Sequence, residues 1–141
     1  MRTRGFTLIE LLVALAIMAI ISAVAVPIYR EYSVRTQRTN AEKDLMLCAQ
    51  SMERLASATF SYAKQVGPGA DTGPVTPNIC TPSTTMYAIA VVAPTNDNTF
   101  TIRATPIVPS VVAGDGILEI DASGATRWDK HGLGTMVPWS Q

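Results

Sequence analysis

The chain has 141 residues, which is enough for one small domain together with an extended helix. It carries 11 basic and 11 acidic side chains, so its formal net charge is zero, and only 6% of its residues are aromatic. This composition argues against a nucleic-acid-binding surface, because it offers neither a basic excess nor a set of aromatic rings on which bases stack.

The N-terminal stretch is the most informative part of the sequence. A short basic leader, residues 1–4, precedes an apolar run from Leu11 to Ile28 in which Ser22 is the only polar side chain. At 1.5 Å per residue this run makes a helix of about 27 Å, close to the thickness of the hydrocarbon core of a bilayer. Glu10 stands at the front of the run, where lipid penalises a carboxylate by about 2.5–3.5 kcal/mol, so an acid there indicates a function.

Two ordinary explanations leave part of this stretch unexplained. The apolar run is longer than the usual core of about 7–15 residues in a secretory signal, and no small-residue cleavage site closes it cleanly. A plain membrane anchor fits the length, and Arg2 and Arg4 would keep the N-terminus in the cytoplasm. A plain anchor does not account for Glu10.

The segment Arg4-Gly5-Phe6-Thr7-Leu8-Ile9-Glu10-Leu11-Leu12 resembles the class III signal of type IV pilins and pseudopilins. The resemblance implies that prepilin peptidase, a membrane aspartyl protease, cuts between Gly5 and Phe6 and methylates the new N-terminus at Phe6. It also implies that Glu10, the fifth residue of the mature chain, sets the register of filament assembly by approaching the Phe6 amine of a neighbouring subunit. The alternative, that Glu10 serves only recognition by the peptidase, stays open.

One helix is expected from about residue 6 to residue 63. Pro27 should kink it, because proline removes one backbone hydrogen bond and clashes with the preceding turn; the alternative is that the helix ends there. Tyr29 and Tyr32 fall where a membrane–water boundary is expected, as amphipathic rings prefer. In the second half of the helix an apolar stripe predicts one buried face. The stripe consists of Ala41, Leu45, Cys48, Ala49, Met52, Leu55, Ala56 and Thr59.

The rest of the chain predicts an antiparallel sheet, and the fold class is therefore α+β with about four strands. Residues 66–85 are rich in glycine and proline, so regular structure is not expected there. The expected strands are Tyr87–Val92, Thr99–Thr105, Gly116–Asp121 and Ala125–Asp129, with a loop over Ile107–Asp115 and an unassigned tail over 130–141. The alternation in the second of these strands puts Phe100, Ile102 and Ala104 on the buried face.

Two cysteines, Cys48 and Cys80, are present. They are either two separate buried thiols or a disulfide. The resemblance to pilins places the mature head outside the cytoplasmic membrane, where disulfides persist, so a bridge is expected. It would close a loop of about 32 residues and contribute about 3.5–4 kcal/mol in the chain-entropy model.

No catalytic constellation is evident, so the chain is expected to be the substrate of an enzyme rather than an enzyme. Its single histidine, His131, is expected to be exposed. No cofactor, metal or nucleic acid is predicted as a partner. The one alternative is calcium bound by some of the turn acids and amides, and turn chemistry explains these residues without an ion. They are Asn96, Asp97, Asn98, Asp115 and Asp121.

Function follows from the resemblance, which extends to PilE-like minor pilins through residues 48–54, 113–116 and 127–129. It implies a type IV minor pilus subunit that supports pilus biogenesis, twitching motility and adhesion. The implied partners are prepilin peptidase, other pilins, the inner-membrane assembly machinery and, before assembly, the lipid bilayer. The expected location is the inner membrane, as a single-pass protein, and then the pilus at the cell surface. A type II secretion pseudopilin and a DNA-uptake pilin remain alternatives.

The expected organisation has five parts. They are a cleaved leader at 1–5, a hydrophobic transmembrane and filament-core helix at 6–28, the amphipathic half of the same helix at 29–63, a loop at 64–85, and the sheet with its tail at 86–141.

Overall fold

The computed structural model describes residues 6–139. Its first element is the helix α1 (Leu8–Thr59), which begins and ends a few residues inside the predicted range. Pro27 lies inside α1, so the alternative that the helix ends at this proline is wrong, while the kink stays a prediction. The chain divides into two compact units, residues 1–33 and 34–141, and the division falls within α1.

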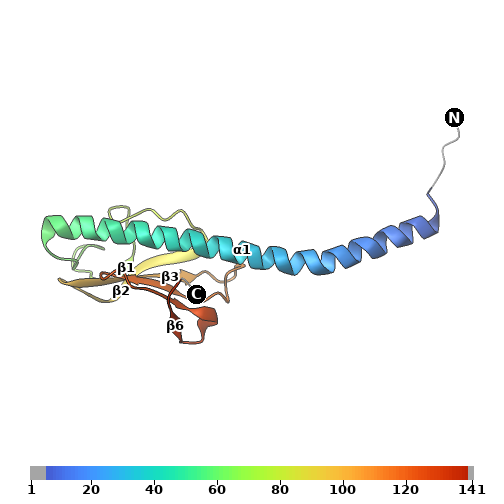
Figure 1. Cartoon of the computed structure of the whole chain (residues 1–141). Helices are drawn as coiled ribbons and strands as arrows, with labels where there is room; N and C mark the ends of the chain where they lie inside the picture. Colours follow the sequence, from blue (N-terminus) through green and yellow to red (C-terminus); the bar gives the residue numbers. More distant parts are fainter. Residues whose placement is uncertain (1–5, 140–141) are drawn as a thin grey trace. The chain divides into compact units, whose positions relative to one another are not determined.

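The second unit carries a six-stranded antiparallel sheet whose strands follow one another in chain order. Figure 1 shows this sheet beside the part of α1 that belongs to the same unit. The strands are β1 (Gly73–Pro74), β2 (Tyr87–Asn96), β3 (Thr99–Pro106), β4 (Leu118–Asp121), β5 (Thr126–Asp129) and β6 (Met136–Val137). The α+β class is confirmed, and the expected number of about four strands was too low, because two-residue strands extend the sheet at both edges.

The additional strands lie where the sequence pattern was weakest. β1 falls in the glycine- and proline-rich segment and pairs Gly73 with Val91 of β2. β6 falls in the unassigned tail, which also holds a short 3-10 helix, η1 (Lys130–Gly132). Two-residue strands are too short to show an alternating pattern, and they form only because a neighbouring strand offers an unpaired edge.

β2 continues past the position where the sequence predicted its end. The expectation rested on Pro94, which cannot donate a ladder hydrogen bond. The strand nevertheless reaches Asn96, and its pairing with β3 shifts register between Val92 and Asn96. This irregularity removes the need for a backbone donor at the proline, so the strand passes through it.

The core of the second unit lies between α1 and one face of the sheet. The predicted helix stripe is buried except at its C-terminal end, where Leu55 is half-buried and Thr59 is exposed. Phe100, Ile102 and Ala104 are buried on β3, as their alternation predicted. The buried members of the stripe are Ala41, Leu45, Cys48, Ala49, Met52 and Ala56.

Candidate functional site

The start of α1 brings Thr7 and Glu10 together in a reciprocal cap. One carboxylate oxygen of Glu10 accepts hydrogen bonds from the backbone N–H and the hydroxyl of Thr7, both at 2.9 Å. The N–H of Glu10 in turn donates to the Thr7 hydroxyl at 3.3 Å. This is a capping box, and the Thr-x-x-Glu spacing is the sequence signal from which it could have been predicted. Glu10 is therefore exposed yet hydrogen-bonded within its own chain.

The predicted cleavage position is only partly visible. Phe6 is 89% exposed, immediately before the capping box. Gly5, after which the cut is expected, lies outside the described residues. Within residues 6–139 nothing covers Phe6, so the start of the segment that follows the expected cut is accessible.

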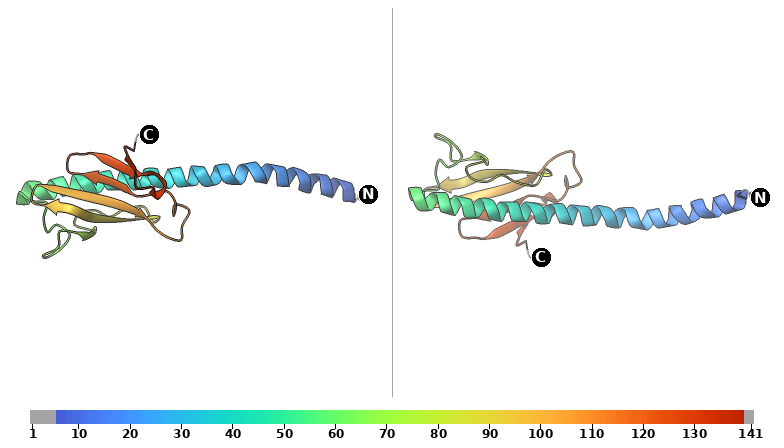
Figure 2. Two further views of the ribbon diagram at one scale, coloured as in Figure 1. Left: turned by 90° about the horizontal axis from the view of Figure 1, so that it is seen from below. Right: turned by 90° about the horizontal axis from the view of Figure 1, so that it is seen from above.

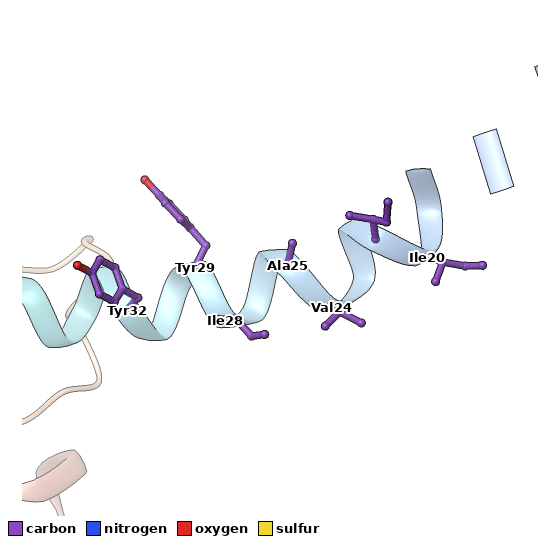
Figure 3. A pocket seen from close by; sticks show the side chains of 7 residues that line it. Ile20, Val24, Ala25, Ile28, Tyr29 and Tyr32 are labelled. Atoms are coloured by element: carbon purple, nitrogen blue, oxygen red, sulfur yellow. The ribbon is translucent and has the colours of Figure 1, made fainter. Parts of the chain in front are cut away.

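The first unit presents an uncovered apolar surface. Every side chain from Phe6 to Tyr32 is exposed, and α1 is long and apolar enough to cross a membrane by length and composition. A shallow groove on this helix has an almost entirely apolar lining (Figure 3). Its lining residues are Ile20, Ile21, Val24, Ala25, Ile28, Tyr29 and Tyr32. An apolar surface that extends from Phe6 to Tyr32 requires lipid or other helices to cover it.

The segment between α1 and β2 is attached to α1 at two residues, Cys48 and Asp44. Cys48 and Cys80 form a disulfide with their Cα atoms 5.1 Å apart, which confirms the predicted bridge. Four residues earlier on the helix, buried Asp44 accepts hydrogen bonds from the backbone N–H groups of Ser83, at 2.9 Å, and Thr84, at 2.8 Å. Asp44 was not predicted to be buried, although its spacing of three and four residues from Ala41 and Cys48 puts it on the buried stripe.

Asp115 is the centre of a second attachment, here called the head lock. This buried carboxylate accepts hydrogen bonds from Arg38 of α1, with Nε at 2.8 Å and a second bond from Nη2, and from the hydroxyl of Tyr87 at 2.6 Å. The indole N–H of Trp128 donates to the Asp115 carbonyl at 2.8 Å, and the Arg38 guanidinium lies 3.8 Å from the centre of the Trp128 ring. The head lock thus joins α1, β2, β5 and the β3–β4 connection.

The Asp115 carboxylate of the head lock affects the pKa values of its two neighbours, Tyr87 and Arg38. Burial, followed by the hydrogen bond to Asp115, raises the pKa of Tyr87 well above its ordinary value. The hydrogen bond to Asp115 is also the main cause that raises the pKa of Arg38. The carboxylate therefore stabilises the protonated form of both neighbours, and the arrangement is structural rather than poised for proton transfer.

Gly116 makes the close packing at the head lock possible. Its φ of +91° lies in the left-handed region, and a Cβ on it would come within 1.7 Å of the Asp129 carbonyl oxygen. No side chain fits there. Gly116 ends the stretch 113–116 that resembles minor pilins, and the structure shows why this position is a glycine.

The remaining candidate residues do not form a site for an ion. Asp97 accepts a hydrogen bond from the Ser61 hydroxyl at 2.6 Å, and Asp121 accepts hydrogen bonds within its own turn. Asp115 is occupied by Arg38 and Tyr87. Within residues 6–139, no group of three or more histidine, cysteine or acidic side chains is arranged to hold a metal. His131 is exposed, as expected, and has a φ of 62°.

Two family models cover most of the chain. Residues 1–26 match the prokaryotic N-terminal methylation motif. Residues 27–115 match the family described as type IV minor pilin ComP, DNA uptake sequence receptor. The resemblance to pilins is thereby confirmed over both the helix start and most of the head.

Individual relatives match over short stretches. A fimbrial protein of Pseudomonas aeruginosa is 48% identical over 42 residues, which is 30% of this chain and 27% of the relative. The type IV major pilin protein PilE of Neisseria gonorrhoeae is 50% identical over 38 residues, 27% of this chain and 23% of the relative. The chain thus matches only about a quarter of the length of these relatives.

A solved structure extends the likeness to the whole fold. The non-core minor pilin PilV of Neisseria meningitidis superposes with a TM-score of 0.53 at 14% identity, covering 78% of this chain and 92% of PilV. At this identity the likeness shows the fold alone. Family and fold are those of structural proteins. The chain belongs to the ComP family of type IV minor pilins, and it is a pilus subunit with a long N-terminal helix packed on an antiparallel sheet.

Proposed function

We propose that this minor pilin is held in the inner membrane by a single pass of α1 and enters the filament through the same helix. The observation that carries the proposal is the exposed apolar surface from Phe6 to Tyr32. Before assembly lipid covers this surface, and in the filament the helices of neighbouring pilins replace the lipid. In this way the subunit supports pilus biogenesis, twitching motility and adhesion, together with the assembly machinery of the inner membrane.

Processing precedes assembly in this proposal. Prepilin peptidase cuts between Gly5 and Phe6 and methylates the Phe6 amine. The capping box then holds the Glu10 carboxylate at the first turn of α1, close in sequence to the new amine. A neighbour's Phe6 amine that approaches this end of the helix meets the carboxylate.

Glu10 supplies register rather than net stability. A buried ion pair gains little overall, because both charges lose water. An acid left unpaired among apolar helices, however, costs several kcal/mol, so subunits in the wrong register are rejected. The Thr7 hydroxyl donates a hydrogen bond to the Glu10 carboxylate and accepts one from the Glu10 N–H. The carboxylate therefore keeps one hydrogen-bonding partner while the subunit is in the membrane, before assembly.

Processing is tested by replacing the residue at the expected cut. Gly5→Val adds a branched side chain where the peptidase approaches the backbone closely, so the precursor is expected to stay uncut in the membrane. Thr3→Val places the same side chain two residues away and is the matched control that should be cut normally. Intact mass of the membrane-extracted proteins distinguishes the outcomes, and a methylated Phe6 terminus on the Gly5→Val protein would contradict the assignment.

DNA uptake is a second function, supported by the description of the family that residues 27–115 match. The structure contributes three exposed lysines of the second unit, Lys43, Lys64 and Lys130, none of which takes part in an ion pair within residues 6–139. Such lysines are able to neutralise phosphates, which would make DNA affinity fall with salt concentration. This function goes against the expectation that no nucleic acid is a partner, which rested on the zero net charge and the low aromatic content.

The DNA function is tested by titrating the purified full chain with a labelled duplex at several salt concentrations. Binding is expected to weaken as salt rises, and a triple Lys→Gln variant at positions 43, 64 and 130 should bind more weakly with a smaller salt dependence. Arg103→Gln is the control, because Arg103 is already paired with Glu119. Absence of wild-type binding at low salt would exclude DNA as a ligand of the isolated subunit.

Secretion is distinguished from pilus function in a deletion strain. Loss of twitching with normal exoprotein secretion supports the pilus subunit. Loss of secretion with normal twitching would instead identify a type II secretion pseudopilin.

A further inference from the structure

The connection between β3 and β4 exposes apolar side chains that the fold leaves uncovered. Ile107, Val108 and Val111 are 41%, 73% and 58% exposed. The segment from Thr105 to Gly114 contains no charged residue. Single exposed apolar residues are common on soluble proteins, but three within five positions form a patch. These three residues are called the loop patch below.

The loop that carries the patch is firmly held. Val112, next to the patch, is fully buried, and the Asp115 N–H donates to the Val112 carbonyl at 2.9 Å. The N–H of Ile107 donates to the Met86 carbonyl at 2.9 Å. The head lock fixes the end of the loop through Asp115. An anchored loop thus presents these exposed apolar side chains outward.

The loop lies at the end of the head from which the chain leads back to the membrane-spanning segment. Its anchor Arg38 is only six residues after Tyr32, so the chain between them spans at most about 20 Å in any arrangement of the two units. The opposite end of the sheet, the β2–β3 turn, meets the far end of α1, where the Tyr62 N–H donates to the Asp97 carbonyl at 3.3 Å. Figure 2 shows the loop, orange, at the end of β3 away from that turn.

The surroundings of the loop suit an anionic lipid surface. The backbone N–H of His131 donates to the Asp115 carbonyl at 3.3 Å, so η1 lies beside the end of the loop. Lys130 in η1 is exposed, with its ammonium 5.6 Å from the centre of the Trp128 ring, and Leu133 just after it is 77% exposed. Apolar side chains next to a lysine are the combination that binds at the headgroup and acyl boundary of membranes with anionic lipids.

We propose that, before assembly, the head rests on the bilayer surface through the loop patch, with Val108 and Val111 inserted at the headgroup boundary and Lys130 facing anionic headgroups. The proposal rests on the proposed membrane anchoring of α1. Lipid is the occupant because a short stretch of chain joins the head to the proposed membrane-spanning segment and so keeps the loop near the bilayer. A second subunit, in contrast, has to be recruited.

The test uses the full chain, one copy per nanodisc of phosphatidylcholine and phosphatidylglycerol, with an environment-sensitive fluorophore on one added cysteine. The native cysteines are bonded to each other and do not react. A probe at Val108→Cys is expected to shift its emission to the blue and to be quenched by nitroxide lipids. A probe at Asn98→Cys, in the β2–β3 turn, should behave as in water. A probe at Ala14→Cys reports separately whether α1 is in the bilayer.

A second change separates lipid contact from other causes of burial. Val111→Asp with Lys130→Glu should abolish the quenching of the probe at position 108, while Ser123→Asp, in the β4–β5 turn, should leave it unchanged. Unaltered near-UV circular dichroism of the variant protein shows that the head remains folded. If the probe at position 108 is exposed to water while the probe at position 14, in a separate protein, is quenched, the lipid contact of the loop patch is overturned. The anchoring of α1 would still stand. Protection of the probe only after other pilin subunits are added would assign the patch to a subunit interface instead.

Discussion

The two units of this pilin treat the same kinds of side chain in opposite ways. In the first unit apolar side chains are outside, as at Ile20, which is 68% exposed, whereas Leu45 on the same helix is completely buried in the second unit. Carboxylates differ too. Glu10 is exposed and bonded to a residue three positions away, while buried Asp115 is bonded to residues 28 and 77 positions away. The buried carboxylate of Asp115 is satisfied by residues of its own chain, whereas the apolar surface at the start of α1 depends on partners outside the chain.

Among the substitutions that test this comparison, Asp115→Ala is expected to have the largest effect on the stability of the head. The substitution leaves the Arg38 guanidinium and the Tyr87 hydroxyl without their carboxylate, and the free energy of unfolding of the head should fall by about 3 kcal/mol. Urea unfolding of the detergent-solubilised full chain, followed through the buried Trp128, measures it. Glu53→Ala removes only an exposed hydrogen bond to Tyr62 and should cost about 1 kcal/mol or less. Equal effects of the two substitutions would show that the head lock does not hold the head together.

The disulfide is expected to contribute a similar amount. Replacing Cys48 and Cys80 together by alanine should lower the free energy of unfolding by about 2–4 kcal/mol. Reduction of the wild-type protein should produce a similar loss, which separates the bond from the loss of the side chains. In denatured, unreduced protein taken from the cell envelope, a thiol reagent should label neither cysteine. Labelling of both would contradict the bridge.

A substitution at the end of α1 should raise stability. Phe60 has a φ of 56° in the left-handed region, which costs a residue with a side chain about 1–2 kcal/mol relative to glycine, and its ring is 91% exposed. Phe60→Gly should therefore stabilise the head by about 1 kcal/mol. Ala58→Gly, within the helix and also exposed, should destabilise it by about 1 kcal/mol. Thermal unfolding of both variants gives the comparison, and a loss at Phe60→Gly would indicate that the ring makes a contact of its own.

The smallest expected effect is a loss of stability of the head at alkaline pH. The folded head raises the pKa of Tyr87 through burial and the hydrogen bond to Asp115, so the protonated hydroxyl stabilises the fold. That contribution is fully present below the unfolded pKa of about 10 and is lost as the pH rises toward the folded pKa. Urea midpoints should fall above about pH 10, and less steeply for Tyr87→Phe. Tyr29→Phe, in the first unit, should follow the wild type; a wild-type slope in Tyr87→Phe would exclude Tyr87 as the cause.

The sequence predicted those parts of the fold that repeat a local pattern. The long helix, its buried stripe and the alternation in β3 each follow from the spacing of apolar residues, and the bridge followed from the export implied by the N-terminal motif. The two-residue strands β1 and β6 were missed because their pairing depends on a neighbour, and the end of β2 was wrong because a register shift accommodates Pro94. Asp44 and Asp115 were not identified as attachment points, since their partners lie far away in sequence.

The dependence of the start of α1 on partners is tested most directly at Glu10. Glu10→Val removes the carboxylate but keeps the apolar helix, so the protein should still be cut and methylated and yet be depleted from the filament. Leu11→Val, at the next position, keeps Glu10 and is expected to assemble normally. Sheared pili from strains expressing each variant are purified and immunoblotted for this subunit, after intact mass has confirmed a methylated Phe6 terminus. Depletion of Glu10→Val alone is the predicted result, and normal incorporation of the cleaved, methylated Glu10→Val protein would contradict a register role for Glu10.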